Sequence, residues 1–173
     1  TWPTVWSDVG SVTDVTIDGE LVKEHLGVNF VGVEFSLDAS AMTHLHVDVW
    51  TPDVDSLLVR LVDFLGDGFA GPNGDTQGEL TIDLSATQGE WVSLDIPLED
   101  FQAAGLTSLT DLNQLVIDPT PDGTPRNTAS VYFYNADGVG ELLTNGDMET
   151  GQGPWIGQAT CVDDTGNSEM QGR

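Results

Sequence analysis

Short stretches in which apolar and polar residues alternate recur along the chain, separated by Gly, Pro, Asp and Asn. Alternation with a period of two is typical of β-strands that are buried on one face, and helical periodicity is scarce. A short helical turn is predicted only at residues 98–104, where Pro97 stands at the start. We therefore expect an all-β fold, a β-sandwich of the jelly-roll type with about eight antiparallel strands and little helix. The predicted strands are residues 12–17, 28–35, 45–50, 57–64, 79–84, 91–96, 112–117 and 130–134.

Three of these strands place polar or aromatic side chains on the face opposite the core. If the outward faces belong to one sheet of a curved sandwich, the side chains form one groove. An indole offers a flat apolar surface to a sugar ring, while Asp, His and Arg side chains hydrogen-bond to hydroxyl groups. The pattern therefore predicts a carbohydrate-binding groove; the alternatives are core tryptophans and a His–Asp network that braces the sheet. The side chains concerned are those of His46, Asp48, Trp50, Arg60 and Trp91.

Two further tryptophans, Trp2 and Trp6, lie near the start of the chain in a segment without strand alternation. A loop places fewer packing demands on an indole than a strand does, so both are candidates for sugar contact. The alternative is that they pack as ordinary apolar side chains on the domain.

The charge of the chain narrows the classes of partner. It has 29 Asp and Glu residues against four Lys and Arg, a net charge of −25, and the acidic residues are spread throughout. Such a field repels phosphate backbones and anionic lipid surfaces, which excludes nucleic acid as a partner. Spread acidity with so few cations predicts adaptation to high salt, the alternative being simply a solvated acidic surface. No apolar run is long enough to span a membrane as a helix.

A Gly-rich loop at residues 66–78 contains Asp67, Asn73 and Asp75. Carboxylate and amide oxygens are the ligands that Ca²⁺ takes, so these three side chains are candidates for a structural calcium site. The spacing is not that of an EF-hand, and an acidic loop in an acidic protein is also accounted for by solvation alone.

The pattern changes after residue 135. Residues 136–140 have the composition of a linker, and a new apolar and polar pattern follows. We expect residues 1–135 to form the sandwich and residues 136–173 to be a linker and the truncated start of a second sandwich module. The alternative is a C-terminal extension that packs on the first domain.

Catalysis has little support in the residues. A glycosidase needs two carboxyl groups across a cleft, and many pairs exist among the acidic residues, but no hydrolase motif is present. Cys161 is the single cysteine and falls in the truncated tail, where a nucleophilic role is not expected. We therefore expect the chain not to be an enzyme.

Several blocks of the sequence together resemble a known type of module. They are residues 42–53, 61–64, 89–101 and 131–135, together with the spacing of Trp2 and Trp6. The chain resembles the noncatalytic carbohydrate-binding β-sandwich modules appended to secreted polysaccharide-degrading enzymes of marine bacteria, such as family 16 β-glucanases. The pattern departs from the family at Ala129 and Ser130, where relatives often carry Asp-Asn.

The resemblance implies binding of a polysaccharide, first a β-glucan of the laminarin type, and an extracellular or cell-surface location. It also implies covalently linked catalytic or binding modules that the chain directs to their substrate, and it raises the expectation of a structural Ca²⁺. A structural or adhesive sandwich without sugar affinity is the alternative.

Overall fold

The computed structural model describes residues 3–17, 20–119, 130–134 and 143–144. It confirms all eight predicted strands and the predicted helical turn, which begins directly after Pro97. The prediction of an all-β sandwich with little helix is confirmed. The elements are β1 (Asp8–Ile17), β2 (Glu20–Leu37), β3 (His44–Trp50), β4 (Ser56–Asp63), β5 (Thr76–Asp83), β6 (Trp91–Pro97), α1 (Leu98–Ala103), β7 (Leu112–Asp118), β8 (Ser130–Tyr134) and β9 (Leu143–Thr144).

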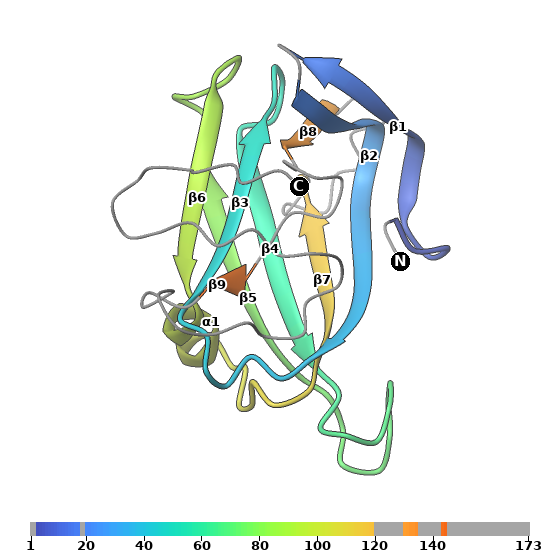
Figure 1. Ribbon diagram of the computed structural model, residues 1–173, viewed down its shortest axis with the longest axis vertical. Helices are drawn as coiled ribbons and strands as arrows, with labels where there is room; N and C mark the ends of the chain where they lie inside the picture. Colours follow the sequence, from blue (N-terminus) through green and yellow to red (C-terminus); the bar gives the residue numbers. More distant parts are fainter. Residues whose placement is uncertain (1–2, 18–19, 120–129, 135–142, 145–173) are drawn as a thin grey trace, which may run out of the picture.

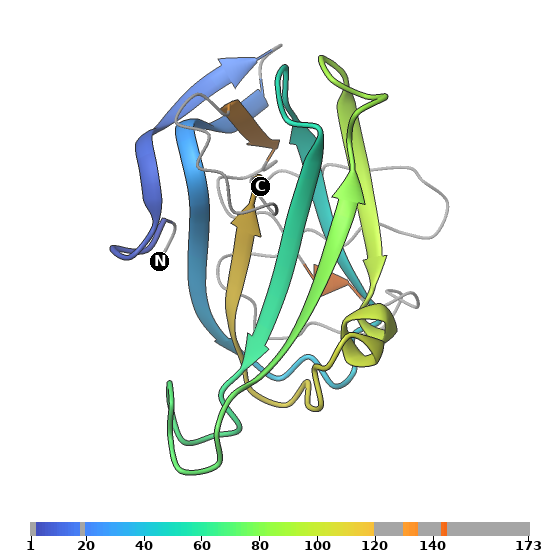
Figure 2. The ribbon, with the colours of Figure 1, turned by 180° about the vertical axis from the view of Figure 1, so that it is seen from behind.

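The strands form two sheets that share the long strand β2, and all the pairings are antiparallel. The first half of β2 pairs with β1 and β8, and β8 leads on to β3 and β6; we call this the front sheet. The second half of β2 pairs with β7, which leads on to β4 and β5; we call this the back sheet. Figure 1 shows β3 and β6 of the front sheet toward the viewer. Figure 2 shows the molecule from the other side, with β4 and β5 of the back sheet toward the viewer.

The core lies between the two sheets, as the alternation of apolar positions predicts. Every second residue of β3 and of residues 56–61 in β4 is buried, and α1 closes one end of the sandwich with Leu98 and Phe101. Each fully buried large apolar side chain contributes roughly 1.5–3 kcal/mol, so this set supplies most of the stability. The most deeply buried apolar side chains include Leu45, Val49, Leu57, Leu61, Phe101, Leu112, Leu115 and Ile117.

Helix α1 approaches the back sheet at a glycine of β5. A Cβ atom placed on Gly78 would lie 2.2 Å from the carbonyl oxygen of Phe101. Because backbone atoms cannot give way as a flexible side chain does, only glycine permits this approach of helix to strand.

The predicted second module at residues 136–173 lies outside the described residues apart from β9. These two residues pair with His44 and Leu45 of β3, so they add to the front sheet of the first domain. The division into residues 1–135 and 136–173 stays a prediction. Among the described residues, no helix is long and apolar enough to cross a membrane.

Candidate functional site

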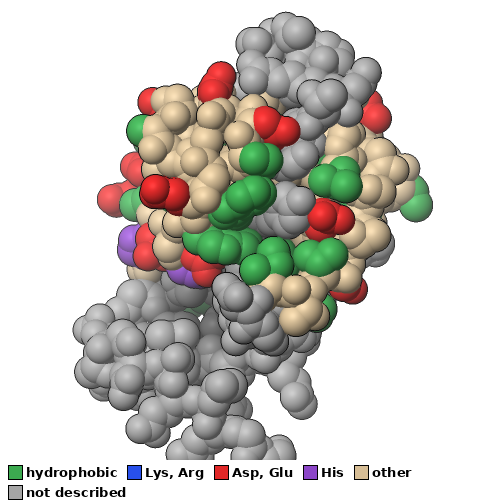
Figure 3. Space-filling view, turned by 90° about the horizontal axis from the view of Figure 1, so that it is seen from above, with side chains coloured by type: hydrophobic (Ala, Val, Ile, Leu, Met, Phe, Trp, Pro, Cys, Tyr) green, Lys and Arg blue, Asp and Glu red, His purple; other side chains and the backbone are tan. Residues whose placement is uncertain are grey.

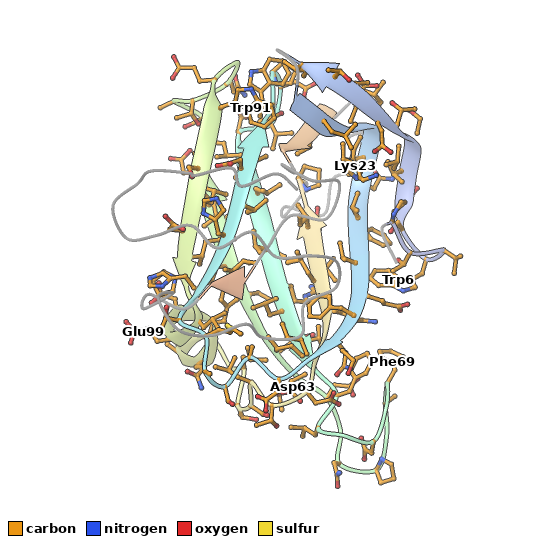
Figure 4. The ribbon with its side chains drawn as sticks, in the orientation of Figure 1. Trp6, Lys23, Asp63, Phe69, Trp91 and Glu99 are labelled. Carbon is orange, nitrogen blue, oxygen red and sulfur yellow. The ribbon has the colours of Figure 1, made fainter. Side chains whose placement is uncertain are left out.

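Trp6 lies against the outward face of β2 (Figure 4). The neighbours of Gly32 in β2 point into the core, and a Cβ on Gly32 would lie 1.9 Å from the indole of Trp6. The indole stacks on Phe30 with a centroid distance of 6.1 Å and an angle of 25°, and its Nε1 donates to Glu34 Oε1 at 2.7 Å. Glycine at this position therefore lets an aromatic ring rest directly on the strand.

The segment that carries Trp6 is anchored to the same glycine. The amide of Thr4 donates to the carbonyl of Gly32 at 2.9 Å, and the amide of Gly32 donates to Ser7 Oγ at 2.8 Å. Because hydrogen bonds hold both sides of Trp6, the position of its indole is set by backbone contacts and its own Nε1 bond.

The outward face of the back sheet continues from Trp6 across three more strands. Gly32 is paired with Val116 of β7, Val116 with Arg60 of β4, and Arg60 with Glu79 of β5. Val116 is 8% exposed although it faces outward, so the floor of this face is apolar. We call this surface the Trp6 face; it consists of Trp6, Phe30, Gly32, Glu34, Arg60, Val62, Gln77, Glu79, Gln114 and Val116.

Polar side chains border this apolar floor. Arg60 Nε donates to Glu79 Oε1 at 2.6 Å, and Gln77 Nε2 donates to the same oxygen at 3.3 Å. The next row across the sheet pairs Glu34 with Gln114, Gln114 with Val62 and Val62 with Gln77. The Trp6 face thus presents an aromatic pair at β2 and guanidinium, amide and carboxylate groups on the strands that follow across the sheet.

A second set of candidate residues lies on the outward face of the front sheet. Trp50 is paired with Trp91, Asp48 with Ser93, and His46 with Asp95. Trp91 is 42% exposed and Trp50 is half-buried. We call these six residues the Trp50/Trp91 strip. Figure 3 views the end of the sandwich where Trp91 lies in Figure 4, and it shows hydrophobic side chains gathered there with acidic side chains around them and histidine at one margin.

His46 is held between two carboxylates. Its Nδ1 lies 2.8 Å from Asp95 Oδ1, and its Nε2 lies 3.8 Å from Asp48 Oδ1. The nearby carboxylate of Asp48 is the largest of the effects that raise the pKa of His46 to about 9, and the same contact lowers the pKa of Asp48. The imidazolium is therefore charged at neutral pH, and the network that braces β3 against β6 is present.

We expect the stability of the chain to fall as the pH rises from about 6.5 to about 9. The folded state binds the proton of His46 more tightly than the unfolded state does, so this stabilisation is complete below the ordinary pKa of 6.5 and is lost through about 9. An NMR titration of the His46 ring should give a pKa near 9, and urea melts of His46→Gln should lack this part of the pH dependence. A ring pKa near 6.5 would contradict the expectation.

The structure divides the candidate sugar-binding residues between two faces. Trp6 and Arg60 lie on the back sheet, whereas His46, Asp48, Trp50 and Trp91 lie on the front sheet. The expectation of one groove is therefore corrected, because β4 pairs with β5 and β7 and does not join β3. Trp2 lies outside the described residues.

Several residues of the Trp6 face are not marked as site residues by the sequence pattern. They are Phe30, Glu34, Glu79 and Gln114, which lie in predicted strands, and Gln77, which falls in the predicted Gly-rich loop but belongs to β5 in the structure. The signal available was Gly32, since a glycine inside a Val-rich strand often marks the close approach of another group.

The predicted calcium ligands lie in the loop between β4 and β5. Both carboxylate oxygens of Asp75 accept from the amide of Ala70 at 3.1 Å, and Asp67 Oδ2 accepts from the amide of Asn73 at 2.6 Å. Asp67 Oδ1 is buried without a hydrogen-bond partner. Within the described part of the chain, no three His, Cys, Asp or Glu side chains are grouped to hold a metal ion. The three side chains hydrogen-bond to the backbone of their own loop, and calcium binding stays a prediction from the sequence.

No protein-family model matches this sequence, and a comparison with curated proteins gives no match. Among solved structures, a family 30 carbohydrate-binding module is similar with a TM-score of 0.51 and 13% identity, covering 96% of this chain and 92% of its own. Another structure of a family 30 module gives a TM-score of 0.50 at 13% identity, covering 79% of this chain and 91% of its own.

A family 11 carbohydrate-binding module from Clostridium thermocellum, solved in complex with a β-1,3-1,4-mixed-linked tetrasaccharide, has a TM-score of 0.50 and 15% identity. It covers 76% of this chain and 84% of its own. At this level of identity, the three likenesses show that the chain shares the β-sandwich fold of these modules.

Proposed function

We propose that this chain is a noncatalytic carbohydrate-binding module that holds a neutral polysaccharide on its Trp6 face. The observation that carries the proposal is the indole of Trp6, which rests on Gly32 and is fixed by Glu34. Supporting it are the fold, shared with family 30 and family 11 carbohydrate-binding modules, and the resemblance of the sequence blocks to such modules.

The chemistry of the face suits a sugar chain. The C–H groups of a pyranose pack against an aromatic ring, while the equatorial hydroxyls need donors and acceptors at the ring's edge. The stacked pair of Trp6 and Phe30 supplies the apolar surface, and Arg60 with Gln77 supplies donors two and three strands away. Because these side chains come from rigid paired strands, little ordering is needed on binding.

The ligand class follows from charge. Arg60 is paired with Glu79, and the chain carries 25 net negative charges, so anionic polymers are repelled. A neutral β-glucan is the first candidate, of the laminarin type or of the mixed-linkage type found bound to the family 11 module. The module then directs linked catalytic or binding domains of a secreted or surface protein to this polymer, raising the local concentration of substrate.

Replacement of Trp6 by alanine should weaken polysaccharide binding about 5- to 150-fold, since loss of an aromatic stacking contact costs roughly 1–3 kcal/mol. Affinity electrophoresis over laminarin, mixed-linkage β-glucan and xylan measures the effect. Phe69→Ala is the matched control, because Phe69 is a 72% exposed aromatic residue on the β4–β5 loop. Wild-type protein that no neutral glycan retards would instead support a structural or adhesive sandwich.

Replacement of Gly32 by alanine tests the placement of Trp6 without removing it. The new Cβ would meet the far end of the indole, which can swing away, so the fold should persist while the platform is lost. Binding should fall about as far as in Trp6→Ala. If Gly32→Ala binds polysaccharide with the affinity of the wild type, the placement of the Trp6 indole on β2 is not needed for binding.

A further inference from the structure

We propose that the Trp50/Trp91 strip is a second glycan-binding site, which makes the module bivalent. The class of ligand rests on the proposed function, whereas the geometry of the second site is independent of the Trp6 face.

The strip is a ladder of three residue pairs on two neighbouring strands. The core residues that alternate with them are Leu45, Val47 and Val49 in β3 and Leu94 and Ile96 in β6. The six side chains of the strip are therefore all directed to the outside of the front sheet. At roughly 3.3 Å per residue, the ladder from Trp50 to His46 is about 13 Å long.

The indole of Trp91 remains exposed at one end of this ladder. It is one of four large hydrophobic side chains with an exposed fraction of 38% or more among the described residues. Trp50 stands directly opposite on β3, so the exposed ring belongs to a pair. An exposed indole next to a half-buried one, with polar side chains further along the same two strands, is the composition of a sugar-binding surface.

The polar end of the ladder is pre-organised. His46 is bound to Asp95 at 2.8 Å and lies 3.8 Å from Asp48, which faces Ser93 on the neighbouring strand. A fixed network loses little side-chain entropy when it binds hydroxyl groups. These side chains carry carboxylate, hydroxyl and imidazolium groups, which together accept and donate hydrogen bonds.

The strip and the Trp6 face lie on opposite sheets of the sandwich. The outward residues of the two sheets are separated by the core, which is about 10 Å thick between backbones. A sugar chain on one face therefore cannot also occupy the other at the same point along its length. Two faces that bind separate chains make the module a cross-linker of polysaccharide, which strengthens retention through avidity.

The test measures stoichiometry and cross-linking with two probes, the β-1,3-1,4-mixed-linked tetrasaccharide and soluble mixed-linkage β-glucan. Calorimetry of the wild type with the tetrasaccharide should fit two sites per chain, and Trp6→Ala and Trp91→Ala should each keep one. The double variant should keep neither, and Phe69→Ala should keep both. The wild type should raise the viscosity of the β-glucan, whereas either single tryptophan variant should not.

Two further measurements test the assignment of the second site to the strip even if Trp91→Ala fails to fold: the variant Trp50→Ala, and NMR of a protein whose strip is intact. In Trp6→Ala, the tetrasaccharide should shift the indole N–H signal of Trp91 and the ring signals of His46. One site that is lost in Trp6→Ala and unchanged in Trp91→Ala and Trp50→Ala overturns the second site and leaves the proposed function standing. One site that is lost in Trp91→Ala alone overturns bivalency and the placement on the Trp6 face, and absence of binding in the wild type overturns both proposals.

Discussion

Sodium chloride at about 1–2 M should raise the thermal midpoint of unfolding by at least about 10 °C over its value at low salt. For a chain of this size, each kcal/mol of unfolding free energy shifts the midpoint by roughly 2–4 °C, so this shift corresponds to a gain of about 3–5 kcal/mol. The reason is that 29 carboxylates face four Lys and Arg residues. Screening of this repulsion is nearly complete at 1 M, where the Debye length is about 3 Å. Thermal melts monitored by circular dichroism measure the effect.

Attractive ion pairs do not reverse this expectation. The Lys and Arg side chains in the described part of the chain are already paired, Lys23 with Asp14 and Arg60 with Glu79, and His46 is paired with Asp95. All three pairs are partly exposed, and such pairs contribute about 0–1 kcal/mol each. Salt therefore removes more repulsion than attraction.

A charge variant supplies the control for the salt effect. Asp53, Asp55 and Glu90 are exposed on two loops that are joined by the hydrogen bonds of Gly89 to Thr51 and of Leu84 to Asp55. A variant with Asp53→Asn, Asp55→Asn and Glu90→Gln should be more stable than the wild type at low salt and equal to it at 2 M. A midpoint that is constant or falls with salt contradicts the adaptation to high salt.

Replacement of Asp63 by alanine should destabilise the chain by about 2–6 kcal/mol. Asp63 is fully buried at the end of β4, and its Oδ1 accepts from the amide of Leu65 at 2.7 Å while its Oδ2 accepts from the amide of Asp111 at 2.9 Å. Alanine would leave both amides without acceptors, and each such loss costs roughly 1–3 kcal/mol. Urea denaturation measures the change.

The two bonds of Asp63 also join the β4–β5 loop to the residue before β7, since Leu65 lies in that loop and Asp111 precedes β7. Figure 4 shows Asp63 near the end of β4. Hydrogen exchange at the amides of Leu65 and Asp111 should accelerate in Asp63→Ala. Asp63→Asn keeps one carbonyl acceptor and should lose about half as much stability. A loss below about 1 kcal/mol in Asp63→Ala would mean that water replaces the carboxylate at no cost.

Most of the strands could be predicted because the alternation of apolar and polar residues in the sequence matches their burial; β1 has no buried residue, and residues 20–27 of β2 were not predicted as strand. In β3 the apolar residues Leu45, Val47 and Val49 alternate with polar ones, and the same residues are buried in the structure. The start of α1 could also be predicted from neighbouring residues, because proline is compatible with the start of a helix and not with its interior, and Pro97 directly precedes α1.

Alternation assigns each side chain of a strand to one of two faces, but it does not say which sheet the strand joins. Arg60 was correctly placed on the outward side of its strand, yet β4 belongs to the back sheet and β3 to the front sheet. Sheet membership depends on pairing between strands far apart in the sequence, such as β4 with β7, and no local pattern encodes it.

The sequence by itself determined the fold class, the order of the strands and the acidic character of the surface, because burial periodicity, turn residues and charge are properties of neighbouring residues. Tertiary structure decided how the candidate residues are grouped. It placed Trp6 on Gly32, opposite Val116 and Arg60, and it left His46, Asp48, Trp50 and Trp91 on the other sheet. The physical reason is that β2 crosses from one sheet to the other, so the two faces arise from long-range pairing on either half of a single strand.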